Sequence, residues 1–161
     1  MKKILLSFSI LIACATNIAA QSPIEAFLTM PQELLPYFSE AQRNAIGQQL
    51  VIAMQENDTT ILHAVPNLFG KESRPLSLTE KSMCIEIADG IEYDWLVENN
   101  KILLIQTLCS PICSSAVSEY DMDWQRIRTI QPDKEGVFIR AHIENDTLVF
   151  TDETPEEKLA D

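Results

Sequence analysis

The spacing of hydrophobic residues changes once along this chain, near Leu76. Before that point, apolar side chains recur at helical spacing in the series Ile46, Leu50, Ala53 and Met54. This spacing predicts a helix with one apolar face. After that point, apolar and polar residues alternate in short runs separated by turn dipeptides, which is typical of antiparallel strands. The pattern therefore predicts N-terminal helices followed by a sheet.

Both helices are predicted to begin with a capping box. In Ser22-Pro23-Ile24-Glu25 the serine is the N-cap, with proline at the first helical position and glutamate at the third. This helix should be short because Pro31 and Pro36 follow it. Ser39-Glu40-Ala41-Gln42 begins a second, longer helix that we expect to end near Gln55.

Turn dipeptides predict how the strands pair. A two-residue loop at Asn99-Asn100 gives compatible pairs, namely Glu98 with Lys101, Val97 with Ile102, Leu96 with Leu103, and Trp95 with Leu104. A three-residue loop at Ala88-Asp89-Gly90 pairs Ile87 with Ile91, Ile85 with Tyr93, and Met83 with Trp95. A two-residue loop at Asn145-Asp146 closes a last hairpin over residues 137–151, with Ile143 opposite Leu148, Ala141 opposite Phe150, and His142 opposite Val149.

These registers give the sheet two different faces. One is apolar, and we expect the N-terminal helices to cover it. The other carries Glu86, Glu92 and Asp94 near the edge of the sheet, and we expect it to be wet. The strand from Ile102 to Cys109 is apolar on both faces and is therefore predicted to be central. Residues 129–136 are predicted to form a loop.

The predicted fold is α+β, with N-terminal helices packed on one face of an antiparallel β-meander of about six strands. Residues 21–151 are long enough to form one domain with its own core. Residues 152–161 are rich in Asp and Glu and are predicted to form an acidic tail.

Residues 1–20 read as a secretory signal peptide. A short positive start precedes an apolar run that is too short to span a bilayer, and cleavage is predicted after Ala20. Leu11-Ile12-Ala13-Cys14 also matches a bacterial lipobox, so lipidation of Cys14 is the alternative. The expected location is the periplasm or the exterior, or the outer membrane if Cys14 carries a lipid anchor. No membrane span is predicted.

Composition narrows the classes of function. Removal of Lys2 and Lys3 with the signal leaves 10 basic and 24 acidic side chains, a net charge of −14. This charge opposes binding to nucleic acid. With four glycines in total, a nucleotide-binding loop is disfavoured, and no cofactor is predicted. His63 and His142 are interpreted as ordinary polar residues.

Export to an oxidising compartment favours disulfide pairing among the remaining cysteines. The turn Ser110-Pro111-Ile112 places Cys109 opposite Cys113, within disulfide reach. Cys84 falls level with Asp94, about 13 Å along the strands from Cys109, and is predicted to be free. A thiol-redox role for Cys109 and Cys113 is an alternative, although redox cysteines usually lie at a helix N-terminus.

The acidic side chains Glu119, Asp121 and Asp123 lack the glycine and the closing glutamate of a calcium loop. We interpret them as a solvated strand edge, with Tyr120, Met122 and Trp124 directed toward the core. No metal site and no catalytic residue is predicted. A hydrolase with carboxylate chemistry is an alternative, although the sequence selects no acid pair.

Two short motifs, Asp58-Thr59-Thr60 and Asp146-Thr147-Leu148, resemble the Asp-Ser/Thr-apolar acceptor of Bacteroidetes O-glycosylation. Thr59 and Thr147 are therefore candidate glycosylation sites.

A wider resemblance rests on Leu108-Cys109-Ser110-Pro111, Ser114-Ser115 and Tyr120-Asp121-Met122-Asp123-Trp124, supported by residues 27–31, 34–37 and 78–79. Together these segments resemble an exported Bacteroidales family known only as a domain of unknown function. The resemblance implies an envelope location and supplies no activity and no site residues. We therefore expect a non-catalytic envelope or secreted module that binds a protein or a glycan.

Overall fold

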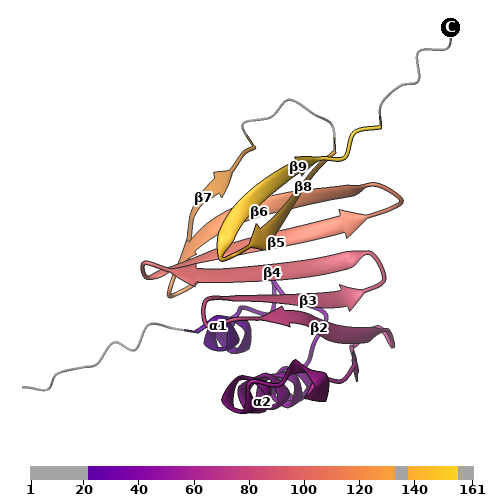
Figure 1. The fold of residues 1–161 in the computed structure, drawn as a ribbon, viewed down its shortest axis with the longest axis vertical. Helices are drawn as coiled ribbons and strands as arrows, with labels where there is room; N and C mark the ends of the chain where they lie inside the picture. The colour runs from indigo at the N-terminus through magenta and orange to yellow at the C-terminus, as the bar shows by residue number, and fades with distance from the viewer. Residues whose placement is uncertain (1–21, 133–137, 156–161) are drawn as a thin grey trace, which may run out of the picture.

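A computed structural model describes residues 22–132 and 138–155, and Figure 1 shows its ribbon. Helices come first: α1 (Pro23–Thr29), α2 (Glu40–Glu56) and the 3-10 helix η1 (Thr59–Ile61). The strands that follow are β1 (Val65–Pro66), β2 (Glu72–Leu78), β3 (Ser82–Ala88), β4 (Ile91–Glu98), β5 (Lys101–Cys109), β6 (Cys113–Asp121), β7 (Arg126–Ile130), β8 (Ile139–Glu144) and β9 (Thr147–Asp152).

Both helices begin where the capping boxes predict. The Ser22 hydroxyl accepts a hydrogen bond from the Glu25 N–H at 3.2 Å, and the Glu25 carboxylate accepts one from the Ser22 N–H at 2.9 Å. Ser39 and Gln42 make the same reciprocal pair at the start of α2. The second helix ends at Asn57, which adopts a left-handed conformation with φ of 51°.

Strands β1 to β7 form one antiparallel sheet in which each strand pairs with its neighbours in the sequence. The turn at Asn99-Asn100 has the predicted register, with Glu98 opposite Lys101 and Trp95 opposite Leu104. β5 has partners on both sides, so it is an interior strand as predicted, although β4 is the middle strand of the seven.

The two sides of the sheet carry separate hydrophobic clusters. One cluster contains side chains of α1, α2 and β3–β6, and α1 lies against β3 and β4. At its centre the rings of Phe27 and Trp95 meet edge to face, with centroids 5.6 Å apart. A second, smaller cluster joins Ile105 and Val117 of the sheet to Ala141 of β8. Because Leu104 and Ile105 are consecutive strand residues, these clusters lie on opposite faces.

Strands β8 and β9 form a separate two-stranded sheet, which we call the covering hairpin (Ile139–Asp152). Figure 1 shows it in front of β4–β6, and β8 contacts all three of these strands. Its turn has the predicted register, with Ile143 opposite Leu148 and His142 opposite Val149. The predicted meander of about six strands counted this hairpin among its strands, which is wrong because the hairpin forms a separate sheet packed on β4–β6.

Three strands escaped prediction. β2 contains Pro75 and lacks regular alternation of buried and exposed residues. β1 has two residues, and β7 is exposed at four of its five positions. Thr129 and Ile130 belong to β7, so the loop predicted for residues 129–136 is wrong at its start. Residues 133–136 of that loop lie outside the described residues.

The register at the β3–β4 turn is correct except beside the loop. Met83 lies opposite Trp95 and Ile85 opposite Tyr93, as predicted. The predicted pair of Ile87 and Ile91 is wrong, because a bulge between Glu86 and Ala88 brings Ala88 opposite Ile91. A bulge adds one unpaired residue and increases the local twist, and local alternation alone does not reveal it.

The sheet face predicted to be wet is partly buried. Asp94 is 6% exposed, and Glu86 and Glu92 are half-buried. β3 is also not an edge strand, because β2 pairs with it. The prediction failed because the covering hairpin packs on this face, and the local pattern of residues 82–98 carries no information about that contact.

Candidate binding site

A pocket of about 320 Å³ opens on the side of the sheet that carries the covering hairpin. Its lining comes from the β4–β5 turn region, β6, β7 and β9. Four aliphatic side chains supply the apolar part: Leu96, Leu103, Ile130 and Leu148. The polar part consists of Glu98, Asn99, Lys101, Glu119 and Arg128. The volume lies at the lower end of the range of roughly 300–1,000 Å³ for small-molecule sites.

The Glu119 carboxylate is the most buried charge in this lining, with 7% of its side chain exposed. Its Oε1 lies 2.5 Å from Lys101 Nζ, and its Oε2 accepts a hydrogen bond from Arg128 Nε. The register explains this arrangement, since Arg128 lies directly opposite Glu119 on β7. The hydrogen bond from Lys101 is the main reason that the Glu119 pKa is lowered, and Arg128 adds to it.

This arrangement corrects the interpretation of the acidic residues after Ser118. Glu119 is buried and ion-paired, so it is not part of a solvated edge. Asp121 Oδ1 accepts hydrogen bonds from the backbone N–H groups of Asp123 and Gln125 and closes the turn after β6. Tyr120 and Trp124 are buried as predicted, while Met122 is half-buried. Across residues 22–132 and 138–155, no three His, Cys, Asp or Glu side chains gather closely enough to hold a metal ion.

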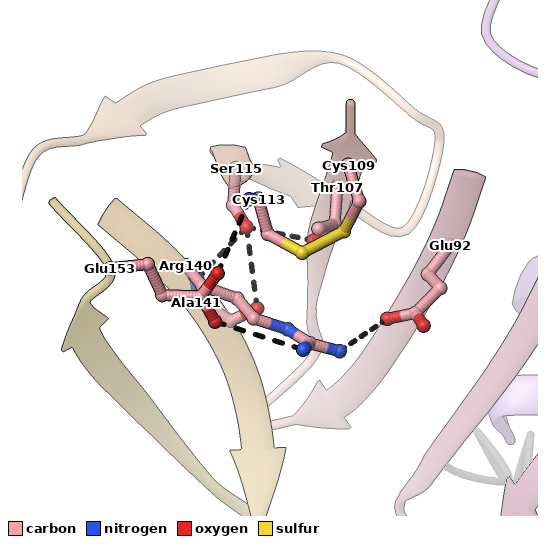
Figure 2. Close-up of polar contacts among 8 residues, drawn as sticks. All are labelled: Glu92, Thr107, Cys109, Cys113, Ser115, Arg140, Ala141 and Glu153. Atoms are coloured by element: carbon pink, nitrogen blue, oxygen red, sulfur yellow. Dashed lines mark hydrogen bonds and ion pairs between the residues drawn. A yellow bond between two sulfur atoms is a disulfide. The ribbon is translucent and has the colours of Figure 1, made fainter. Parts of the chain in front are cut away.

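Polar contacts fix the base of the covering hairpin to the sheet, as Figure 2 shows. Arg140 Nη2 lies 2.8 Å from Glu92 Oε2, and Arg140 Nη1 lies 3.8 Å from Glu153 Oε1. The Ser115 hydroxyl accepts a hydrogen bond from the Ala141 N–H at 2.9 Å. These contacts connect β8 to β4 and β6.

The cysteines are arranged as the predicted register requires. Cys109 lies opposite Cys113, and their sulfur atoms form a disulfide in the turn between β5 and β6. The Cys113 N–H donates to Glu153 Oε2 at 3.2 Å, so Glu153 contacts the sheet and is not a free tail residue. Cys84 is not bonded to another cysteine and lies opposite Asp94.

The half-buried Cys84 of β3 and the buried Asp94 of β4 form a hydrogen-bonded pair. Burial is the largest cause that raises the pKa of Asp94 to about 6, and the charge of Glu92 raises it further. The Cys84 hydrogen bond and the charge of Arg140 act in the opposite direction. Burial also raises the pKa of the Cys84 thiol, with Asp94 as the second cause, which disfavours the reactive thiolate.

The remaining predicted residues do not join the pocket. Thr59 and Thr147 are exposed, on η1 and at the start of β9, and their glycosylation stays a prediction. His63 is exposed and His142 half-buried. Cys14, Ala20 and the predicted signal peptide lie outside the described residues, as do residues 156–161.

Sequence reasoning missed the pocket because its parts come from separate strands. Lys101 was predicted to lie opposite Glu98, yet its nearest carboxylate is that of Glu119. Arg128 was missed because β7 was not predicted. The usable signal was the alternation Arg126-Ile127-Arg128-Thr129-Ile130, which has strand character.

Fold and pocket together define an α+β protein in which a seven-stranded antiparallel sheet carries helices and a separate hairpin. The chain belongs to the family described as protein of unknown function (DUF3256), whose model matches residues 15–157. The resemblance to a family of unknown function is thereby confirmed.

Among solved structures, a domain of an uncharacterized protein from Porphyromonas gingivalis W83 is similar to this chain, with a TM-score of 0.51 and 19% identity. The similarity covers 68% of this chain and 57% of that chain, and at this identity it shows the fold alone. Among the curated proteins, none matches this chain. Within residues 22–132 and 138–155, no helix is long and apolar enough to cross a membrane.

Proposed function

We propose that this protein is a non-catalytic binding module of the cell envelope or the exterior, which holds part of a protein or glycan in the pocket beside the covering hairpin. The observation that carries this proposal is the composition of the pocket. It combines four aliphatic side chains with a few polar groups, the usual composition of a ligand site.

The polar groups of the pocket favour binding over catalysis. Glu119 is held between two cations, and its lowered pKa makes it a poor general acid. Asp94, whose raised pKa would suit an acid, is buried under the covering hairpin and does not line the pocket. Glu119, with a lowered pKa, and Asp94, with a raised pKa, therefore do not face the same pocket as an acid–base pair. This disfavours the hydrolase alternative.

The position of the disulfide disfavours the thiol-redox alternative. Cys109 ends β5 and Cys113 begins β6, so neither belongs to the first turn of a helix among the described residues, where redox cysteines usually lie. The third described cysteine, Cys84, is half-buried and its thiol pKa is raised.

The proposal can be tested with envelope extract of the native organism. The immobilised exported protein should retain a ligand that Arg128→Glu loses, because the substitution puts a second carboxylate beside Glu119 in the pocket. Arg74→Glu is the matched control. Arg74 is also a half-exposed arginine that is paired with a glutamate, Glu86, but it lies on β2.

Mass spectrometry of the retained molecules distinguishes binding from catalysis. A ligand recovered with unchanged mass after incubation supports a binding module, while its fragments would support the hydrolase. Equal retention by the wild-type protein and by Arg128→Glu would contradict the pocket as the binding site.

A further inference from the structure

The pocket beside the covering hairpin has hydrogen-bond donors that the described residues do not use. The Arg128 guanidinium has five N–H groups, and its bond to Glu119 uses the one on Nε. The Lys101 ammonium has three, and one of its hydrogens points to Glu119 Oε1. The side chains of Lys101 and Arg128 are 48% and 64% exposed, so their remaining donors can reach a ligand.

Both carboxylates of the pocket lining already have cationic partners. Glu119 Oε1 pairs with Lys101, and Oε2 pairs with Arg128. The second carboxylate of the lining, Glu98, accepts a hydrogen bond from Lys81 at 2.8 Å. Lys81 pairs with Glu98 from outside the lining, so Lys101 and Arg128 share Glu119. Their remaining N–H donors are available to a ligand, which must then supply oxygen acceptors.

The aliphatic residues of the lining favour a ligand with an apolar group. Leu96, Leu103, Ile130 and Leu148 are aliphatic, and a volume of about 320 Å³ accommodates a small group or the end of a chain. A planar guanidinium with free N–H groups binds a carboxylate through two parallel hydrogen bonds. A ligand with a carboxylate and a compact branched apolar group would therefore match both the polar and the aliphatic residues of the lining.

We infer that the pocket binds a terminal carboxylate carried by a branched apolar group, as at the C-terminus of a peptide that ends in leucine. This inference rests on the proposed binding function and names its ligand chemistry. Arg128 and Lys101 bind the carboxylate, and the four aliphatic side chains of the lining contact the branched apolar group. The donors favour the peptide over a neutral glycan, which has no charged acceptor to match Arg128.

Titration of the exported protein with defined probes tests this chemistry. The probes are acetyl-Ala-Leu-Leu with a free carboxylate, the same peptide with a C-terminal amide, and 4-methylpentanoate. Calorimetry gives the affinities, and NMR shifts of the Asn99 and Leu103 amides report pocket occupancy. We expect the free acid to bind about tenfold more tightly than the amide, the ratio that roughly 1.4 kcal/mol of charge-assisted hydrogen bonding produces.

Two matched pairs of variants locate the effect. Arg128→Gln should abolish the preference for the acid, while Arg74→Gln, which breaks an equivalent surface ion pair, should keep it. Lys101→Gln should reduce the preference, while Lys81→Gln, whose side chain is 50% exposed, should keep most of it. Urea midpoints of all four variants check that each is folded before its affinity is compared.

The outcomes separate the inference from the proposed function. Equal binding of acid and amide at the pocket would overturn the ligand chemistry and leave a binding module. Tighter binding of a neutral chitotriose probe at the same amides would also overturn it, in favour of a glycan. Equal affinity of 4-methylpentanoate and the peptide acid would support the same chemistry with a free acid as its source. Loss of all probe binding, together with retention of envelope ligand by Arg128→Glu, would overturn both.

Discussion

Asp94 shows how one side chain depends on an element distant in the sequence. Its position on β4 follows from the turn at Asn99-Asn100, which the sequence predicts correctly. Its environment includes Arg140 of the covering hairpin, and burial is the largest cause of its raised pKa. The residue was therefore placed correctly in the register and wrongly in its exposure.

The ionisation of Asp94 should make stability depend on pH. Its pKa is raised from 3.8 to about 6 in the folded chain, so the folded state holds a proton that the unfolded state releases. The stability contributed by this proton is complete below pH 4 and is lost as the pH rises to about 6. The full shift corresponds to roughly 3 kcal/mol.

We therefore expect Asp94→Asn to stabilise the protein at pH 7.5 by up to roughly 3 kcal/mol and to have little effect at pH 4. Urea unfolding between pH 4 and 7.5 measures the difference. Asp89→Asn, at the exposed turn between β3 and β4, is the control and should leave the pH dependence of stability as in the wild type. An identical loss of stability between pH 4 and 6 in wild type and Asp94→Asn would refute the assignment.

Cys84 and Glu119 show what register can and cannot predict about a residue. Cys84 was predicted to be out of reach of the other cysteines because position along a strand follows from turn length alone. Glu119 was predicted to be solvated because it would share a strand face with Asp121 and Asp123, but its cationic partners come from the two neighbouring strands. Register determines which residues are opposite, whereas burial depends on which element covers them.

At the scale of elements, the covering hairpin is held at two ends. Its base contacts the sheet through Arg140 and Ser115. At its tip, Asp146 Oδ1 accepts hydrogen bonds from Thr79 Oγ1 at 2.9 Å and from Ser82 Oγ at 2.8 Å. These contacts connect the β8–β9 turn to the β2–β3 turn. Together with the burial of Ala141 between the two sheets, they hold the hairpin in place.

Removal of the tip contact should loosen the covering hairpin without unfolding the sheet. Asp146 and Asn145 both have positive φ, 54° and 50°, so glycine is tolerated at either position. Asp146→Gly loses both hydrogen bonds and should lower the opening free energy of β8–β9 by about 1–2 kcal/mol. Hydrogen exchange of the β8 and β9 amides measures this change.

Asn145→Gly is the matched control, because it makes the same backbone change in the same turn and keeps the Asp146 contacts. Its exchange should match that of the wild type within about 0.5 kcal/mol. Equal protection in the two variants would mean that the tip contact does not hold the hairpin. Loss of protection in β4 and β5 as well would mean that hairpin and sheet open as one unit.

At the scale of the whole molecule, the acidic charge, the predicted export signal and the disulfide agree with the same environment. The net charge of −14 after signal removal favours solubility over binding to anionic polymers. A disulfide persists in an oxidising compartment, which agrees with export. The location of the protein remains our proposal.

Intact mass and thiol labelling of the exported protein test this proposal together. We expect a chain that begins at Gln21, with one cysteine, Cys84, labelled by iodoacetamide after denaturation without reductant. Reduction should expose all three cysteines that follow Ala20. A diacylated mass beginning at Cys14 would identify the lipoprotein form. A label on Cys109 or Cys113 before reduction would contradict the disulfide.

The sequence by itself determined the helix starts, the turns at Asn99-Asn100, Ser110-Pro111-Ile112 and Asn145-Asp146 with the registers around them, and the separation of Cys84 from Cys109 and Cys113. All of these follow from local chemistry: capping side chains, residues that tolerate positive φ, and the two-residue period of a strand. Only the tertiary structure decided that β8 and β9 leave the meander and cover its second face. That choice buries Asp94 and closes one side of the pocket. It depends on the apolar area that distant elements remove from water together, which no local pattern encodes.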